Sequence, residues 1–185
     1  MSHEDVFTEE EESAFYAALD GLCPGAEEIK EVINKRWKSD ALYHYFTMPD
    51  GHVCYIPVTE MLNVTITSPK YGMQMPFRYE ANVPSKRSSS LLPNVIHAID
   101  GYVCREMVRM ANRQGFELLP IHDAFGSHPN YMNQVRHNYI TILSRLASSD
   151  LLSNIISQLD GQKVKLGKYS NDLNEYILRS EYSLS

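Results

Sequence analysis

The spacing of the apolar residues changes twice along the chain, and this change constrains the fold more than any other feature. In residues 26–38 the apolar positions recur at steps of three, four and seven, which predicts an amphipathic helix. Between residues 41 and 80 they form short aromatic and β-branched runs bounded by turn formers, which predicts strands. Helical spacing returns after Pro93. This order predicts an α+β fold in which antiparallel hairpins pack against helices.

The strand region divides into two predicted hairpins. The runs ALYHYFT and HVCYIPV flank the turn MPDG, where Pro49, Asp50 and Gly51 favour a tight reversal. Two further runs, LNVTIT and MPFRYE, are separated by the breaker segment SPKYG. The loop NVPSKRSSSLLPN, rich in turn formers, then separates the strands from the next helix.

A long helix is predicted to follow Pro93 and to end at Gly115, a residue type suited to a helix C-terminus. Its other face carries Arg105, Arg109 and Arg113 at four-residue steps, a pattern typical of a solvated face. The side chains predicted to face the core are Ile96, Ile99, Val103, Met107, Met110 and Ala111.

Further helices are predicted on both sides of this central region. One begins near Pro129 and runs to about Leu146, and shorter ones lie in LLSNIISQL and DLNEYILRS. At the other end, residues 1–25 form an acidic tail and a short helix over residues 13–22, which we expect to pack antiparallel to the helix after it. We therefore expect a division between residues 1–25 and residues 26–185.

Two bulk properties limit the function. No apolar stretch approaches the roughly 18 residues that a membrane helix needs, and the acidic start MSHEDVFTEEEES is unlike a secretory signal, so we expect a cytoplasmic protein without a membrane partner. The formal net charge is −6, whereas phosphate contacts need Lys and Arg, so any nucleic-acid role must be local or shared. The three cysteines are an odd number without paired short spacings, which favours reduced thiols over a zinc site.

Asp123 is the residue that most suggests chemistry. It follows the apolar run FELLPIH and precedes small and aromatic residues, so it is predicted at or near the tip of a tight strand-turn-strand. A carboxylate held there suits a hard cation such as Mg²⁺. The alternative is that Asp123 is a turn former that bonds its own backbone.

The wider pattern resembles a known family. PNVIHAIDG, then a helix, then PIHDAFGSHP is similar to the palm of the single-subunit RNA polymerases of phages and mitochondria, whose motif C reads His-Asp-Ser/Ala-Phe-Gly. TMPDGHVCYIP and PFRYEANVPS resemble family segments upstream, and DLNEYILRSEYSLS resembles the family's carboxyl terminus. The resemblance covers residues 26–185 and implies the C-terminal portion of a palm.

The resemblance implies a role for four residues. Asp123 would bind both catalytic Mg²⁺ ions, and His122 would support it within the hairpin. His97 would reach toward the primer terminus or the nascent base pair. Arg105 occupies a basic position of the same helix, where it would help to position nucleic acid or substrate.

Part of the family's machinery has no counterpart in this sequence. The family also uses an earlier palm aspartate and a fingers helix that holds the incoming nucleotide, and no segment before His97 resembles either. The resemblance therefore implies one subunit of a split polymerase, or a piece of a longer one. Its partners would be a second chain with the missing aspartate and fingers, DNA template, RNA product and nucleoside triphosphates. A phage-encoded enzyme would act in the host cytoplasm.

Two other functions remain open at the sequence level. The chain can be a palm-like interaction module without catalysis, in which Asp123 only forms the turn. It can also be a metal-dependent phosphohydrolase, since His97, His128 and His137 are available as further metal ligands.

Overall fold

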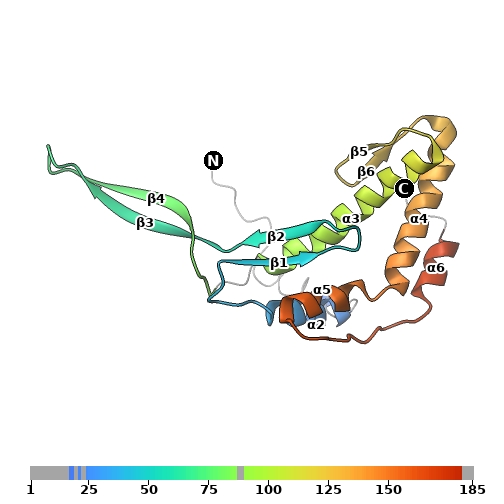
Figure 1. The fold of residues 1–185 in the computed structure, drawn as a ribbon, viewed down its shortest axis with the longest axis horizontal. Helices are drawn as coiled ribbons and strands as arrows, with labels where there is room; N and C mark the ends of the chain where they lie inside the picture. The colour runs from blue at the N-terminus through green and yellow to red at the C-terminus, as the bar shows by residue number, and fades with distance from the viewer. Residues whose placement is uncertain (1–16, 19–20, 22–23, 87–89, 181–185) are drawn as a thin grey trace.

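The computed structural model describes residues 17–18, 21, 24–86 and 90–180 of the chain. Within these ranges it contains five α-helices and three two-stranded antiparallel sheets, which confirms the predicted α+β class. Helices form a body, and one long hairpin projects from it (Figure 1). No helix in the described ranges is long and apolar enough to cross a bilayer.

The first part of the body joins a hairpin to three helices. Strands β1 (Tyr43–Thr47) and β2 (Val53–Pro57) pack on α2 (Pro24–Asn34), α3 (Leu91–Gln114) and α5 (Leu151–Asp160). Alternate residues of β1 point inward, so His44 and Phe46 are buried. Phe46 belongs to a hydrophobic cluster with Ile56 of β2 and with side chains from all three helices, including Ile33, Leu91, Val95, Ile155 and Ile156.

The turn between β1 and β2 forms as the MPDG sequence predicts. The backbone N–H of Gly51 donates to Met48 O over 2.9 Å, and Gly51 has a φ of +82°, which a residue without a Cβ adopts at little cost. The outer edge at Thr47 is covered by Gln158 of α5, whose amide exchanges two hydrogen bonds with the Thr47 backbone at 2.8 and 3.0 Å. This side chain takes the place of a neighbouring strand.

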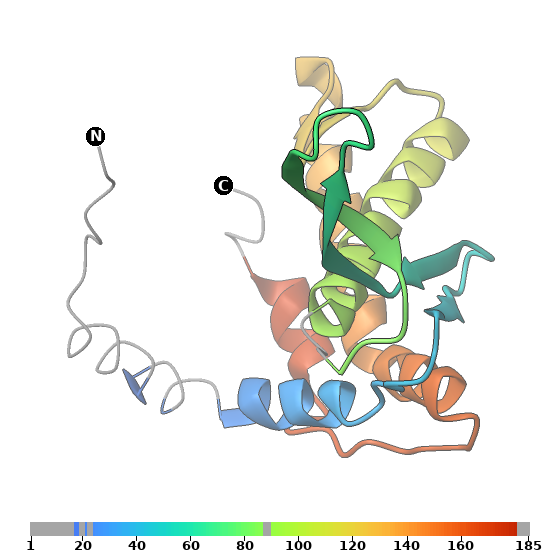
Figure 2. The same cartoon turned by 90° about the vertical axis from the view of Figure 1, so that its left-hand side faces the viewer.

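The second hairpin is longer than the sequence indicates. Strands β3 (Thr59–Thr67) and β4 (Gln74–Asn82) pair over nine positions, where the sequence predicts strands of six residues each. We call this hairpin the arm, because it extends away from the helices (Figure 1) and points toward the viewer in Figure 2. The three hairpins form separate sheets, so the described part contains no continuous palm-like sheet.

Helix α3 spans the whole body. It begins at Leu91, before Pro93, because a proline in the first helical turn removes no intrahelical hydrogen bond. It ends as predicted at Gly115, which has a φ of +77°. One prediction for this helix is wrong: Ile96 is 56% exposed. The buried stripe instead runs through Leu91, Val95, Ala98, Val103, Met107 and Ala111.

A second hydrophobic cluster lies at the other end of α3. There Val103 and Met107 pack with residues of α4 (Met132–Ser148), which follows the short 3-10 helix η1 (Pro129–Tyr131). The buried Asn138 of α4 and Gln114 of α3 exchange side-chain hydrogen bonds at 2.9 and 3.0 Å, which satisfies both amides. Between α3 and α4 the chain forms a third hairpin from β5 (Leu119–Ile121) and β6 (Ala124–Gly126).

The C-terminal segment packs against the helices of the body. Helix α6 (Leu173–Arg179) packs on α4, where Ser144 Oγ donates to Asn174 O over 3.1 Å. In the linker before it, the hydroxyl of Tyr169 donates to the Glu28 carboxylate of α2. The helix predicted over residues 13–22, and its packing, fall largely outside the described residues.

The two hydrophobic clusters predict which substitutions on α3 lower the free energy of unfolding most. Met107→Ala should lower the free energy of unfolding by about 2–5 kcal/mol, because it leaves a cavity where Met107 is fully buried. The neighbouring Val108 is 40% exposed, so Val108→Ala should cost less than about 1 kcal/mol. Urea unfolding followed by circular dichroism compares the two, and equal losses would contradict the assigned core.

Candidate functional site

Asp123 lies at the tip of the β5–β6 hairpin. Ile121 pairs with Ala124, so His122 and Asp123 form a two-residue turn. Such turns need a positive φ at the first position, and His122 has a φ of +56°. A non-glycine residue in this region costs about 1 kcal/mol or more, so the turn is held by the strands around it. Both turn residues are exposed, and the position of Asp123 agrees with the predicted strand-turn-strand.

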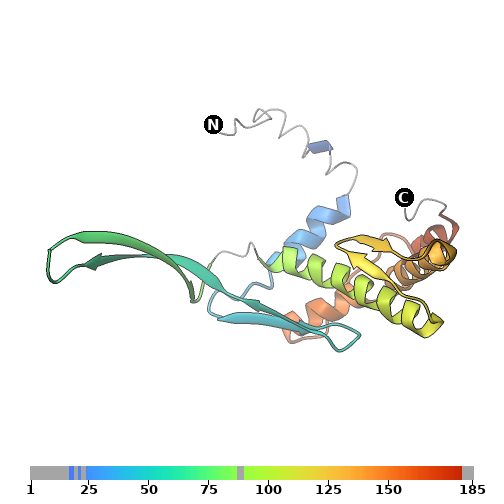
Figure 3. The same cartoon turned by 90° about the horizontal axis from the view of Figure 1, so that it is seen from above.

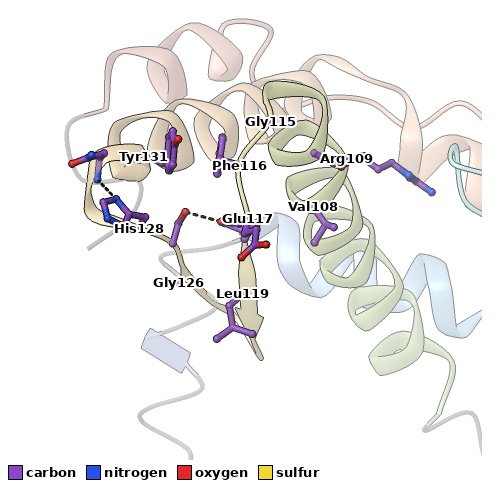
Figure 4. A pocket seen from close by; sticks show the side chains of 13 residues that line it. Val108, Arg109, Gly115, Phe116, Glu117, Leu119, Gly126, His128 and Tyr131 are labelled. Carbon is purple, nitrogen blue, oxygen red and sulfur yellow. Dashed lines mark hydrogen bonds between the residues drawn. The ribbon is translucent and has the colours of Figure 1, made fainter.

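The base of this hairpin is fixed to the helices. Ser127 Oγ donates to Glu117 O over 2.7 Å, which ties the two ends of the hairpin together (Figure 4). The Phe125 ring lies 6.0 Å from the Tyr139 ring of α4, centroid to centroid. A fixed base with an exposed tip suits a carboxylate that must present its oxygens in one position.

The Asp123 carboxylate is unpaired in the described part of the chain, where it forms no hydrogen bond or ion pair. Its oxygens are of the hard type that Mg²⁺ prefers, and Mg²⁺ commonly binds one or two carboxylates together with waters and substrate phosphates. Asp123 therefore fits as one Mg²⁺ ligand. Among the described residues no three His, Cys, Asp or Glu side chains are grouped to hold a metal, so the remaining ligands would come from elsewhere.

The hairpin runs back along α3, with its turn toward the N-terminal part of that helix, as Figures 1 and 3 show. His97 lies on this part of α3 and is exposed. No hydrogen bond or ion pair joins His97 to Asp123 within the described ranges. The structure thus puts His97 on the helix that the hairpin follows, and its contact with a primer or base pair stays a prediction.

Arg105 has a protein partner that the sequence did not predict. Its Nε lies 2.6 Å from Asp50 Oδ2, and Arg109 Nη1 lies 3.0 Å from the same oxygen. Only 3% of the Asp50 side chain is exposed. The hydrogen bond from Arg105 is the main cause that holds the pKa of Asp50 well below its usual range, with Arg109 and the His52 backbone N–H adding to it.

This ion pair fixes the β1–β2 turn to α3. Gly101 lies one helical turn before Arg105, and a Cβ there would stand 3.2 Å from Arg105 Nη1. The missing side chain leaves room for the guanidinium to lie over the helix. Arg105 is partly buried by this ion pair, whereas Arg109 and Arg113 are exposed, so the prediction of a solvated arginine face is wrong at Arg105 alone. A contact between Arg105 and nucleic acid or substrate stays a prediction.

Asp50 is the site residue that the sequence analysis missed. Between Pro49 and Gly51 an aspartate is explained fully by turn formation. The available signal was the four-residue step between Arg105 and Arg109, which places two cations on one helix face where they can bind a shared carboxylate.

A broad groove lies beside the hairpin base rather than at Asp123. It has a volume of about 1190 Å³ and is formed by the C-terminal half of α3, both hairpin strands and η1 (Figure 4). The stacked rings of Phe116 and Tyr131, 4.9 Å apart, form part of its wall together with Arg109 and His128. Asp123 does not line it, so the groove and the His122-Asp123 turn are separate places on the surface.

The histidines of the phosphohydrolase alternative are placed separately. His128 Nδ1 accepts a hydrogen bond from the Asn130 backbone N–H at the start of η1. His137 is exposed on α4. Neither belongs to a metal-binding group in the described ranges, so this alternative gains no support there.

Comparison with known protein families identifies the family of this chain. Residues 27–181 match the family described as DNA-dependent RNA polymerase. The chain belongs to this family. The match spans every element from β1 to α6, including the His122-Asp123 turn, and it confirms the resemblance inferred from the sequence.

One similar protein is a probable DNA-directed RNA polymerase from Gelasinospora sp. (strain G114). The two are 36% identical over 73 residues, a stretch that covers 37% of this chain. The same stretch is 8% of that protein, so the matched part of this chain corresponds to a small part of that polymerase.

We expect Asp50 to contribute to the stability of the folded chain. Asp50→Asn leaves Arg105 without its buried counterion, so we expect the free energy of unfolding to fall by about 2 kcal/mol at pH 7. Because pairing lowers the pKa of Asp50 in the folded chain, its contribution is complete above about pH 5 and is lost as the pH falls below about 4. The variant should therefore lose less stability than the parent on acidification.

Asp160→Asn is the matched control, since Asp160 pairs with Arg36 at 3.6 Å and is 38% exposed. It should change the unfolding free energy by less than about 1 kcal/mol and keep the acid dependence of the parent. Thermal unfolding between pH 3 and 7 measures both variants. Equal acid dependence of parent and Asp50→Asn would contradict the assigned ion pair.

Proposed function

We propose that this chain supplies the metal-binding aspartate of motif C, Asp123, to a DNA-directed RNA polymerase that is active only with a second polypeptide. The observation that carries the proposal is an unpaired, exposed carboxylate at the tip of a hairpin with a fixed base, within the segment that matches the family. Its partners would be a chain with the other palm aspartate and the fingers, DNA template, RNA product and nucleoside triphosphates. The complex would work in the cytoplasm.

Four residues of this chain would have separate roles in nucleotidyl transfer. When bound, the Mg²⁺ ions lower the pKa of the attacking hydroxyl and neutralise charge on the phosphates. Asp123 would hold both ions, and His122, with its constrained backbone, would fix the direction of Asp123. His97 would orient the primer end or nascent base pair from α3. Arg105 would act by holding the β1–β2 turn, with its exposed part facing substrate.

Two observations support the need for a second chain. The described residues contain no group of three metal-binding side chains, so Asp123 alone would fix two ions poorly. The formal net charge of −6 also opposes independent binding of a phosphate backbone. A partner polypeptide with the other palm aspartate would supply the missing metal ligand. If that partner is also more basic and shares the nucleic-acid channel, its charge would support the phosphate contacts.

The proposal is tested in a complex of this chain with its purified partner polypeptide, first shown to polymerise ribonucleotides on a template. Asp123→Asn keeps the size and the turn but removes the charge, so assembly should survive while the rate falls about a thousandfold or more. His97→Ala should reduce it about ten- to a hundredfold, because it misaligns the attack without removing the metals.

Asp40→Asn is the control for loss of one exposed turn carboxylate, and it should leave the rate within about twofold. The chain without its partner should show no polymerisation. If Asp123→Asn kept the rate within about twofold of the parent, Asp123 would be a turn former only, and the non-catalytic interaction module would replace the proposal.

A further inference from the structure

The arm joins the body through two chain crossings, which we call the root of the arm (Figure 1). Where the chain enters the arm, the backbone N–H of the buried Val58 donates to Leu42 O over 2.9 Å. Where it leaves, Trp37 Nε1 donates to the carbonyl oxygen of the buried Ser85 over 2.7 Å. Ser85 Oγ in turn donates to the Glu60 carboxylate of β3. Trp37 therefore helps to hold the arm to the body.

The Trp37 ring lies on a buried histidine. His44 of β1 points inward and is only 5% exposed, and the centroids of the two rings are 4.5 Å apart. His44 Nε2 is buried without a hydrogen-bond partner among the described residues. Buried polar side-chain atoms are usually paired, so an unpaired ring nitrogen next to the side chain that holds the arm requires an explanation.

The surroundings of His44 accommodate a neutral imidazole and oppose an imidazolium. Both ring nitrogens of an imidazolium are hydrogen-bond donors, and Nε2 has no acceptor within the described ranges. Burial is the main cause that lowers the pKa of His44, and the positive charge of Lys38 lowers it further.

The other titratable groups on the elements packed against β1 are neutral, exposed or already paired. Burial raises the pKa of the Cys54 thiol of β2 and of the Tyr102 hydroxyl of α3, so both stay neutral. The charged residues of α2 are exposed, as are His97 and Asp100 of α3, and Asp160 of α5 pairs with Arg36. No described carboxylate is therefore paired with His44 to stabilise its protonated form.

We propose that Trp37 and His44 form a pH-sensitive hinge at the root of the arm, closed over the neutral imidazole and opened when His44 binds a proton. Trp37 is partly exposed and lies directly on the imidazole, so its movement opens a path from His44 to water. The same movement withdraws the indole N–H from Ser85 O and loosens the chain where it leaves the arm. This inference concerns the attachment of the arm and does not depend on the proposed function.

The direction of the pH dependence follows from the protons that each state binds. An imidazole in water has a pKa of about 6.5, whereas the closed hinge holds the pKa of His44 below that value. The closed hinge is therefore fully stable above about pH 6.5, and the open state gains protons as the pH falls below it. Between pH 8 and pH 5 the ratio of open to closed hinge should rise by up to about thirtyfold.

The fluorescence of Trp37 reports on the hinge directly, because Trp37 is the single tryptophan of the chain. Between pH 8 and pH 5 we expect its emission to move to longer wavelength and its quenching by acrylamide to increase, as the ring leaves His44 for water. Hydrogen–deuterium exchange, corrected for its intrinsic pH dependence, should accelerate over residues 58–61 and 82–86. Far-ultraviolet circular dichroism should stay constant, because the helices of the body do not open.

Three variants separate the hinge from other effects of acid. His44→Phe keeps a ring beneath Trp37 but binds no proton, so it should lose the fluorescence change between pH 8 and pH 5. His52→Gln is the matched control, since His52 lies in the turn of the same hairpin but is exposed, and it should keep the full change. Trp37→Phe should accelerate exchange at the root already at pH 8, because phenylalanine cannot donate to Ser85 O.

An NMR titration of the parent chain needs no substitution. The His44 ring should bind its proton below pH 6.5, and the Trp37 indole N–H signal should change over the same range. A His44 ring that titrates at or above pH 6.5, an unchanged Trp37 emission in the parent, or the same emission change in His44→Phe would each overturn the proposal. Parent-like exchange at the root in Trp37→Phe, or loss of helical circular dichroism in parallel with the emission change, would overturn it as well.

Discussion

Helix α3 packs against both hydrophobic clusters, and each candidate functional element depends on it. Its N-terminal half meets β1, β2 and α5 around Leu91 and Val95, and its C-terminal half meets α4 around Met107. The Asp50 ion pair to Arg105 and Arg109 then fixes the first hairpin to its exposed side. A straight helix of 24 residues thus holds the β1–β2 turn, His97 and the base of the β5–β6 hairpin in one frame.

Local signals were enough to predict most elements. The MPDG turn, the Gly115 helix end and the exposed Asp123 turn each follow from residue types within a few positions. Ile96 was misplaced because the buried stripe of α3 serves two clusters in succession, and a single periodic face cannot represent that. Asp50 was missed because its partners are more than 50 residues away, and the four-residue step between Arg105 and Arg109 does not say which carboxylate they bind.

The candidate site combines a precise position with an incomplete ligand set. The hairpin presents Asp123 on a constrained turn, while the described chain supplies no further grouped metal ligands. A carboxylate without companion ligands agrees with the proposed function, in which the remaining metal ligands come from a second chain.

The central claim is that Asp123 binds catalytic metal in the assembled enzyme, and metal-directed cleavage tests it most directly. Fe²⁺ replaces Mg²⁺ in the purified complex, and peroxide with ascorbate then generates hydroxyl radicals that cut the backbone next to the bound metal. The account predicts cuts of this chain at the His122-Asp123 turn that vanish in Asp123→Asn, although the complex still forms. Cuts confined to other segments, or unchanged by that substitution, would contradict it.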